Sequence, residues 1–172
     1  VLDRVIKQNT ENINLLKTKD YNIFSVLQIQ SKEVLICRMI ADLLNPRGQH
    51  GAGAEYLKIF LRDCLGMEKM DTKLADQAIV TAEYAIDDER RIDIVIEIGS
   101  YFLPIEVKIY AADQKSQCFD YYQYAKRRDA QAKVYYLTLD GHRPGKDSTS
   151  SGNRSVTEED IVCLSFREHI LN

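Results

Sequence analysis

The chain has 172 residues, 45% of them hydrophobic, and a formal net charge of −3 at pH 7. This length suits one domain, because a chain of this size buries about two-thirds of its unfolded surface on folding. The negative net charge argues against a protein that coats polyanions with its whole surface. No apolar stretch approaches the ~20 residues that span a bilayer, and no signal peptide is visible.

Residues 1–66 are predicted to form a helical N-terminal region. Apolar positions in residues 1–18 recur with the period of an amphipathic helix. Ser31 is the predicted N-cap of a second helix that ends near Leu44, and a third helix is predicted over about 54–65. The chain starts with Val rather than Met and stops where a further helix is predicted to begin. We therefore expect natural sequence beyond both ends, including a truncated C-terminus.

Residues 78–140 carry the pattern of an α/β core. The predicted elements are three strands at about 78–86, 90–98 and 102–110, a helix at about 113–130 and a strand at about 134–139. The segment 140–155 is polar and rich in Gly and Ser, so we expect a mobile loop there, before a last strand at 161–166. A helix, a three-strand meander, a crossover helix and a strand define a mixed α/β fold in a single domain, 1–172.

The four cysteines stand far apart in apolar surroundings without a C-x-x-C pair: Cys37, Cys64, Cys118 and Cys163. This spacing is typical of reduced thiols in a protein core and not of a zinc site or a disulfide framework. We therefore expect a cytoplasmic protein.

The most informative pattern lies on the second and third predicted strands. Side chains alternate between the two faces of a strand, so Asp93 lies opposite the isoleucines at positions 92, 94 and 96. By the same alternation, Glu106 and Lys108 lie opposite the apolar residues at 105, 107 and 109. A turn near Gly99-Ser100 would pair the two strands in antiparallel orientation. The pairing brings two carboxylates and one ammonium to the same side of the sheet.

Such a cluster costs free energy inside a sheet unless something compensates its charge. A divalent cation is one compensator, because hard cations such as Mg²⁺ prefer carboxylate, carbonyl and water oxygens. A structural salt bridge between Lys108 and either carboxylate is the alternative. Because Lys108 is expected to be partly desolvated, we predict that its pKa is lowered.

Glu33 opens the predicted helix that ends near Leu44, in line with Ile36, Cys37 and Ile40, so it continues the inward-facing stripe. The alternative is a first-turn glutamate that the helix dipole favours.

Gln117 and Tyr121 lie four residues apart and share one face of the helix after Lys108. They are placed either to orient groups above the carboxylates or to pack on the sheet. The run Lys126-Arg127-Arg128 ends this helix and is predicted either to contact nucleic-acid phosphates or to complement the helix dipole.

The helix glutamate, the strand aspartate, Glu-x-Lys on the next strand and Gln-x-x-x-Tyr on the following helix resemble the PD-(D/E)XK nuclease superfamily. The stretches 21–33, 38–51 and 90–124 resemble a bacterial branch of it. Ile92 stands where the family name has proline, and Val107 where many relatives have Asn. Neither change removes a required catalytic side chain, because only the backbone carbonyl is needed at position 107.

The resemblance implies a restriction-endonuclease-like core with extra N-terminal helices, residues 78–140 being the catalytic core. It implies Mg²⁺ or Mn²⁺ as cofactor. The implied metal ligands are Asp93, Glu106, the Val107 backbone carbonyl and Glu33, the last directly or through water. The implied catalytic residues are Lys108, Asp93, Glu106, Glu33, Gln117 and Tyr121.

We therefore expect a Mg²⁺-dependent nuclease that hydrolyses phosphodiester bonds of nucleic acid, DNA rather than RNA. Superfamily members often dimerise, so a homodimer stays open. One alternative is a non-catalytic nucleic-acid-binding or assembly module that retains the fold. A nucleotide-using α/β enzyme is disfavoured, because the one glycine-spaced element, Gly51-Ala52-Gly53, follows a helix instead of a strand.

Overall fold

The computed structural model describes residues 32–68 and 71–170, so the predicted helix at 1–18 and the predicted N-cap Ser31 lie outside the described residues. Helix α3 (Glu33–Leu44) comes first among the described elements and ends at Leu44 as predicted. It buries Cys37, Ile40, Ala41 and Leu44, the three- and four-residue spacing that lines one helix face.

A short helical pair follows α3. Helix α4 (Glu55–Ile59) continues into the π-helical turn η1 (Phe60–Cys64), which confirms the predicted helix over 54–65. Gly66, at φ 65°, follows it in the left-handed conformation that glycine adopts readily at helix ends. Helix α5 (Thr72–Ala75) then leads to the sheet.

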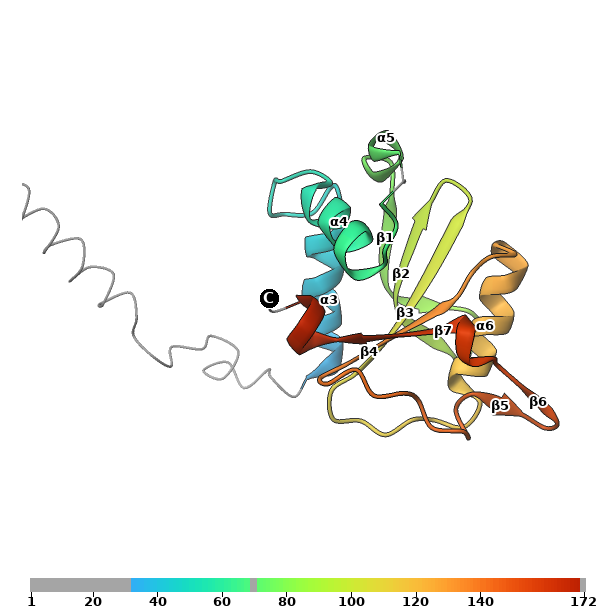
Figure 1. Cartoon of the computed structure of the whole chain (residues 1–172). Helices are drawn as coiled ribbons and strands as arrows, with labels where there is room; N and C mark the ends of the chain where they lie inside the picture. The colour runs from blue at the N-terminus through green and yellow to red at the C-terminus, as the bar shows by residue number, and fades with distance from the viewer. Residues whose placement is uncertain (1–31, 69–70, 171–172) are drawn as a thin grey trace, which may run out of the picture. The chain divides into compact units, whose positions relative to one another are not determined.

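The sheet contains five strands in the order β1-β2-β3-β4-β7 (Figure 1). Their bounds are β1 (Ile79–Ala85), β2 (Arg91–Ile98), β3 (Tyr101–Lys108), β4 (Val134–Thr138) and β7 (Ile161–Ser165). The first three form an antiparallel meander, and β4 and β7 add in parallel. The predicted meander and the predicted turn at Gly99-Ser100 are confirmed.

Helix α6 (Gln117–Arg128) connects β3 to β4. Figure 1 shows α3 and α6 on opposite faces of the sheet. The packing agrees, because Ile105 and Val107 belong to the core cluster that contains α3, whereas Phe102 and Val95 cluster with α6 residues. Strands β2, β3 and β4 are therefore buried on both faces, which explains their nearly continuous apolar sequences.

The predicted face of Ile92 is wrong. Ile92 packs in the α6-side cluster with Val95, whereas Ile94 packs in the α3-side cluster. The alternation breaks between them, at Asp93. Glu83, which would pair with Asp93 on β1, has φ 53° and is skipped in the β1–β2 ladder. The irregular backbone therefore reorients β2 where the site begins.

The segment 140–155, predicted to be a loop, contains secondary structure. This segment contains the hairpin of β5 (Ser150–Ser151) and β6 (Arg154–Ser155), and Ser148 is buried. The carbonyls of Asp147 and Ser148 accept the N–H groups of Ser116 and Phe119. Backbone carbonyls of this segment therefore satisfy N–H groups at the start of α6, which have no partner inside the helix.

Two short elements frame the last strand. The 3-10 turn η2 (Glu158–Asp160) precedes β7, and the π-helical turn η3 (Phe166–Ile170) follows it. The predicted strand at 161–166 is confirmed as β7, which pairs with β4.

Candidate active site

Four element ends meet at one end of the sheet and line a pocket of about 340 Å³. They are the start of β2, the end of β3 and the N-terminal ends of α3 and α6. The pocket brings together all six residues that the sequence predicted to be catalytic: Glu33, Asp93, Glu106, Lys108, Gln117 and Tyr121.

Asp93 sits where β2 and β3 separate. The β2–β3 ladder ends at Ile94 and Ile105, one residue short of a pairing between Asp93 and Glu106. The Val107 N–H donates to Asp93 Oδ2 at 2.8 Å. Burial raises the pKa of Asp93, although the Val107 N–H and the Lys108 charge oppose this. The separation of the strands leaves room for a carboxylate between them.

Glu106 is only 1% exposed, and its two oxygens have different surroundings. Oε1 accepts a hydrogen bond from Lys108 Nζ at 2.5 Å. Oε2 accepts no hydrogen bond from an N–H or O–H donor, and no other buried side-chain nitrogen or oxygen in the described portion of the chain shares this condition. When one of the two carboxyls carries a proton, Glu106 and Asp93 share it in a hydrogen bond. Burial, and then the Asp93 charge, raise the pKa of Glu106 well above its ordinary value. An unpartnered buried carboxylate oxygen calls for a ligand.

The prediction of a lowered pKa for Lys108 is wrong. Burial alone would lower this pKa, but the charges of Glu106, Asp93 and Glu33 outweigh burial and raise it. The amine therefore stays protonated and donates to Glu106. This places the group as a fixed positive charge in the pocket and not as a neutral base.

Glu33 Oε1 accepts three successive backbone N–H groups: Ile109 at 2.6 Å, Tyr110 at 2.9 Å and Ala111 at 3.0 Å. Burial works to raise the pKa of Glu33, but these donors and the Lys108 charge lower it overall. In this structure the carboxylate holds the chain just after β3.

The donor set fits a hard divalent cation held mainly by Asp93 and Glu106. Both side chains line the pocket, and Glu106 Oε2 is free to accept one more partner. Residues 32–68 and 71–170 contain no group of three or more His, Cys, Asp or Glu side chains placed to hold one ion. Mg²⁺ commonly takes one or two carboxylates and keeps water on its other positions.

Gln117 and Tyr121 form a hydrogen-bonded chain on the face of α6 that lines the pocket. Gln117 Nε2 donates to the Tyr121 hydroxyl at 3.1 Å, and this hydroxyl donates to the Arg91 carbonyl at 2.5 Å. Both side chains are buried. They therefore attach the first turns of α6 to the start of β2, beside Asp93.

Arg90 lines the same pocket and was not predicted. Its guanidinium donates to the Asp120 carboxylate at 3.1 Å, the Gln114 amide oxygen at 2.8 Å and the Lys115 carbonyl at 2.5 Å. Arg90 thus joins the β1–β2 turn to the start of α6. Its closeness in sequence to Asp93 was the available signal, but its partners lie 24–30 residues away.

The run Lys126-Arg127-Arg128 lies at the other end of α6 and does not line the pocket. Arg128 pairs with Glu97 at 2.6 Å, and Lys126 with Asp160 at 3.5 Å. Arg127 stacks over the Tyr124 ring at 5.4 Å and has no carboxylate partner within the described residues. Of these three residues, Arg127 is thus the one whose charge no carboxylate offsets among residues 32–68 and 71–170.

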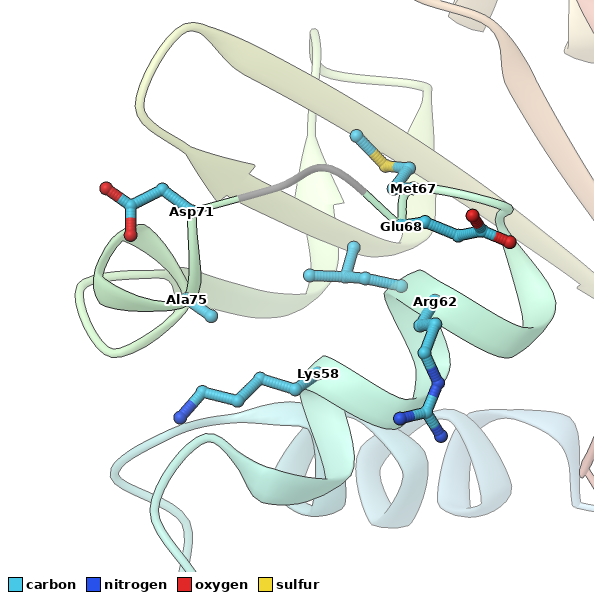
Figure 2. A pocket seen from close by; sticks show the side chains of 7 residues that line it. Lys58, Arg62, Met67, Glu68, Asp71 and Ala75 are labelled. Atoms are coloured by element: carbon cyan, nitrogen blue, oxygen red, sulfur yellow. The ribbon is translucent and has the colours of Figure 1, made fainter.

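A second pocket, of about 130 Å³, lies beside α4, η1 and α5 (Figure 2). None of the predicted site residues lines it. Figure 2 shows the charged ends of Lys58, Arg62 and Glu68 spread apart around it. Lys58 pairs with Asp76 and Arg62 with Asp63. Because its charged groups do not converge, we assign no chemistry to this pocket.

The fold and the site together define a mixed α/β protein with an acidic pocket and one fixed lysine at the end of its central strands. A model of the PD-(D/E)XK nuclease superfamily matches residues 21–170. The chain therefore belongs to the PD-(D/E)XK nuclease superfamily, which indicates a nuclease-type hydrolase. Comparison with curated proteins and with solved structures gave no significant match.

None of the helices in residues 32–68 and 71–170 combines the length and the apolar character that crossing a membrane requires.

Proposed function

We propose that this protein is a metal-dependent nuclease that hydrolyses phosphodiester bonds of DNA, with Mg²⁺ or Mn²⁺ as the ion. The observation that carries this proposal is the unpartnered oxygen of buried Glu106 beside Asp93 and Lys108 in a polar pocket. Residues 78–140 would form the catalytic core of a single domain that includes the helical N-terminal region over residues 1–66. A cytoplasmic location and a homodimer remain predictions.

Each residue has a role that follows from its surroundings. Asp93 and Glu106 would hold the ion, with the Val107 carbonyl as a further oxygen donor. The bound ion supplies a Lewis acid and lowers the pKa of a water molecule. Lys108, whose pKa is raised by the neighbouring carboxylates, would keep its proton on Nζ and offer a positive charge to a substrate phosphate. Tyr121 would hold the Arg91 carbonyl, and Gln117 would hold the Tyr121 hydroxyl, so that the two together keep β2 in place.

A digestion panel tests the proposed activity. The substrates are single- and double-stranded DNA and RNA, with linear and circular forms of the DNA. We expect at least one DNA substrate to be hydrolysed with Mg²⁺ or Mn²⁺, and none with EDTA. Comparison of circular with linear DNA shows whether cleavage needs an end.

The Glu106→Gln variant, purified in the same way, is the control for contaminating nucleases. Hydrolysis at the same rate by Glu106→Gln would contradict the proposed site. Binding of DNA without hydrolysis under all conditions would favour the non-catalytic module.

Salt dependence tests how the helix α6 charges contribute to binding. Each phosphate contact on duplex DNA contributes ~0.9 to the slope of log affinity against log salt. We expect Arg127→Ala to reduce the slope by ~0.9. Arg128→Ala should leave it unchanged, because Arg128 already pairs with Glu97. Fluorescence anisotropy measures the DNA affinity of both variants, in Ca²⁺, which is chosen to block cleavage. An unchanged slope for Arg127→Ala would place the nucleic acid elsewhere.

A further inference from the structure

Three consecutive backbone N–H groups converge on one carboxylate oxygen at the edge of the pocket. The donors are Ile109, Tyr110 and Ala111, and the acceptor is Glu33 Oε1, at 2.6–3.0 Å. Successive N–H groups that face one point form a concave site for an anion. We call the three donors the 109–111 nest.

The nest opens towards the candidate active site. Ala111 and Ala112 line the same pocket as Lys108 and Glu33. The residues 109–116 belong to no helix or strand, so the nest donors have no ladder partner. The acceptor comes from α3, 76 residues or more earlier in the chain. The nest is thus a feature of the backbone that a side chain from another element fills.

A carboxylate oxygen and a phosphate oxygen make the same kind of hydrogen bond to backbone N–H groups. We propose that the 109–111 nest is a phosphate site, that Glu33 occupies it in the absence of nucleic acid, and that a backbone phosphate of the substrate replaces Glu33 there. This inference rests on the proposed function and adds where one substrate phosphate is held.

The exchange also accounts for the position of Glu33. With Oε1 in the nest, Glu33 does not join Asp93 and Glu106, and the described residues hold no cluster of three acidic ligands. Once a phosphate takes the nest, the Glu33 carboxylate is free to turn towards the ion or its water. Substrate binding would then free Glu33 to act as the accessory metal ligand that the family resemblance implies.

The test uses metal-free protein with EDTA and inorganic phosphate as the probe. Backbone amide NMR shifts report binding at the nest, and titration gives the dissociation constant. We expect Glu33→Ala to bind phosphate about tenfold or more tightly than wild type, because three N–H donors to an anion are vacated. Glu33→Gln should show a smaller gain in phosphate affinity, since its amide oxygen can stay in the nest.

Comparison of these variants separates the effect of the Glu33 charge from the effect of its side chain occupying the nest. If Glu33→Ala and Glu33→Gln gain equally, only the removal of charge matters and the proposal is overturned. The proposal is also overturned if phosphate titration of Glu33→Ala does not shift the NMR signals of the 109–111 amides. Glu55→Ala removes another first-turn glutamate, on α4 and away from the pocket, and should leave phosphate affinity unchanged.

Glu33→Asp covers the case in which Glu33→Ala does not fold. It keeps the charge but shortens the side chain by one methylene, so the carboxylate reaches the nest less well. We expect it to bind phosphate more tightly than wild type, and equal affinity would overturn the proposal. Because these measurements need neither metal nor hydrolysis, an inactive protein would contradict the proposed function without deciding the nest.

Discussion

Lys108→Ala is expected to lower kcat for DNA hydrolysis by about 10²–10³-fold, the loss seen when one preorganised transition-state donor is removed. Lys108 is 8% exposed, and the charges around it raise its pKa. In the metal-free pocket its amine is therefore protonated at neutral pH. Single-turnover cleavage at saturating Mg²⁺ measures the effect on the chemical step. Asp93→Ala and Glu106→Ala should remove hydrolysis as well, because each removes an ion ligand.

Lys133→Ala is the matched control for loss of a lysine. Lys133 is exposed and does not line the pocket. Its variant should cleave at the wild-type rate. Melting curves should show Lys108→Ala still folded, because the raised pKa of Glu106 lets this carboxyl take a proton when its partner is lost. Undiminished cleavage by folded Lys108→Ala would refute the site.

Divalent ions are expected to raise the melting temperature of the wild-type protein by roughly 5–11 °C at a concentration 100 times the dissociation constant. This follows from about 2.7 kcal/mol of linkage stabilisation and ~2–4 °C per kcal/mol for a domain of this size. Glu106→Gln should lose most of this response. Glu97→Gln, which changes a β2 carboxylate outside the pocket, should keep it. An unchanged wild-type curve on Mn²⁺ titration would refute the metal site.

Without metal, the contribution of Glu106 to the free energy of unfolding depends on pH. The folded-state pKa of Glu106 is raised above its ordinary value of 4.5. Its contribution to stability is therefore present below about pH 4.5 and is lost as pH rises through the folded-state pKa. In EDTA, the melting temperature of Glu106→Gln should be close to that of wild type near pH 5 and higher than that of wild type at pH 8. Asp93→Asn should behave alike, because burial also raises the pKa of Asp93.

The local features of this chain were predictable from its sequence. Strand and helix positions follow from side-chain periods that are properties of neighbouring residues. The approach of Asp93 to Glu106 and Lys108 also follows, because one tight turn at Gly99 joins the two strands. Asp93, Glu106 and Lys108 consequently line one pocket.

Only the tertiary structure decided the environments of these residues. Glu33 faces backbone donors 76–78 residues away, and segment 145–150 reaches back to satisfy the start of α6. The raised pKa of Lys108 depends on three carboxylates from three elements. The face of Ile92 depends on irregular backbone at Glu83. Contacts of this kind join groups that are far apart in the chain, and no local period encodes them. Residue types and spacing determined which groups reach the pocket, while packing between distant elements determined their partners and their charge.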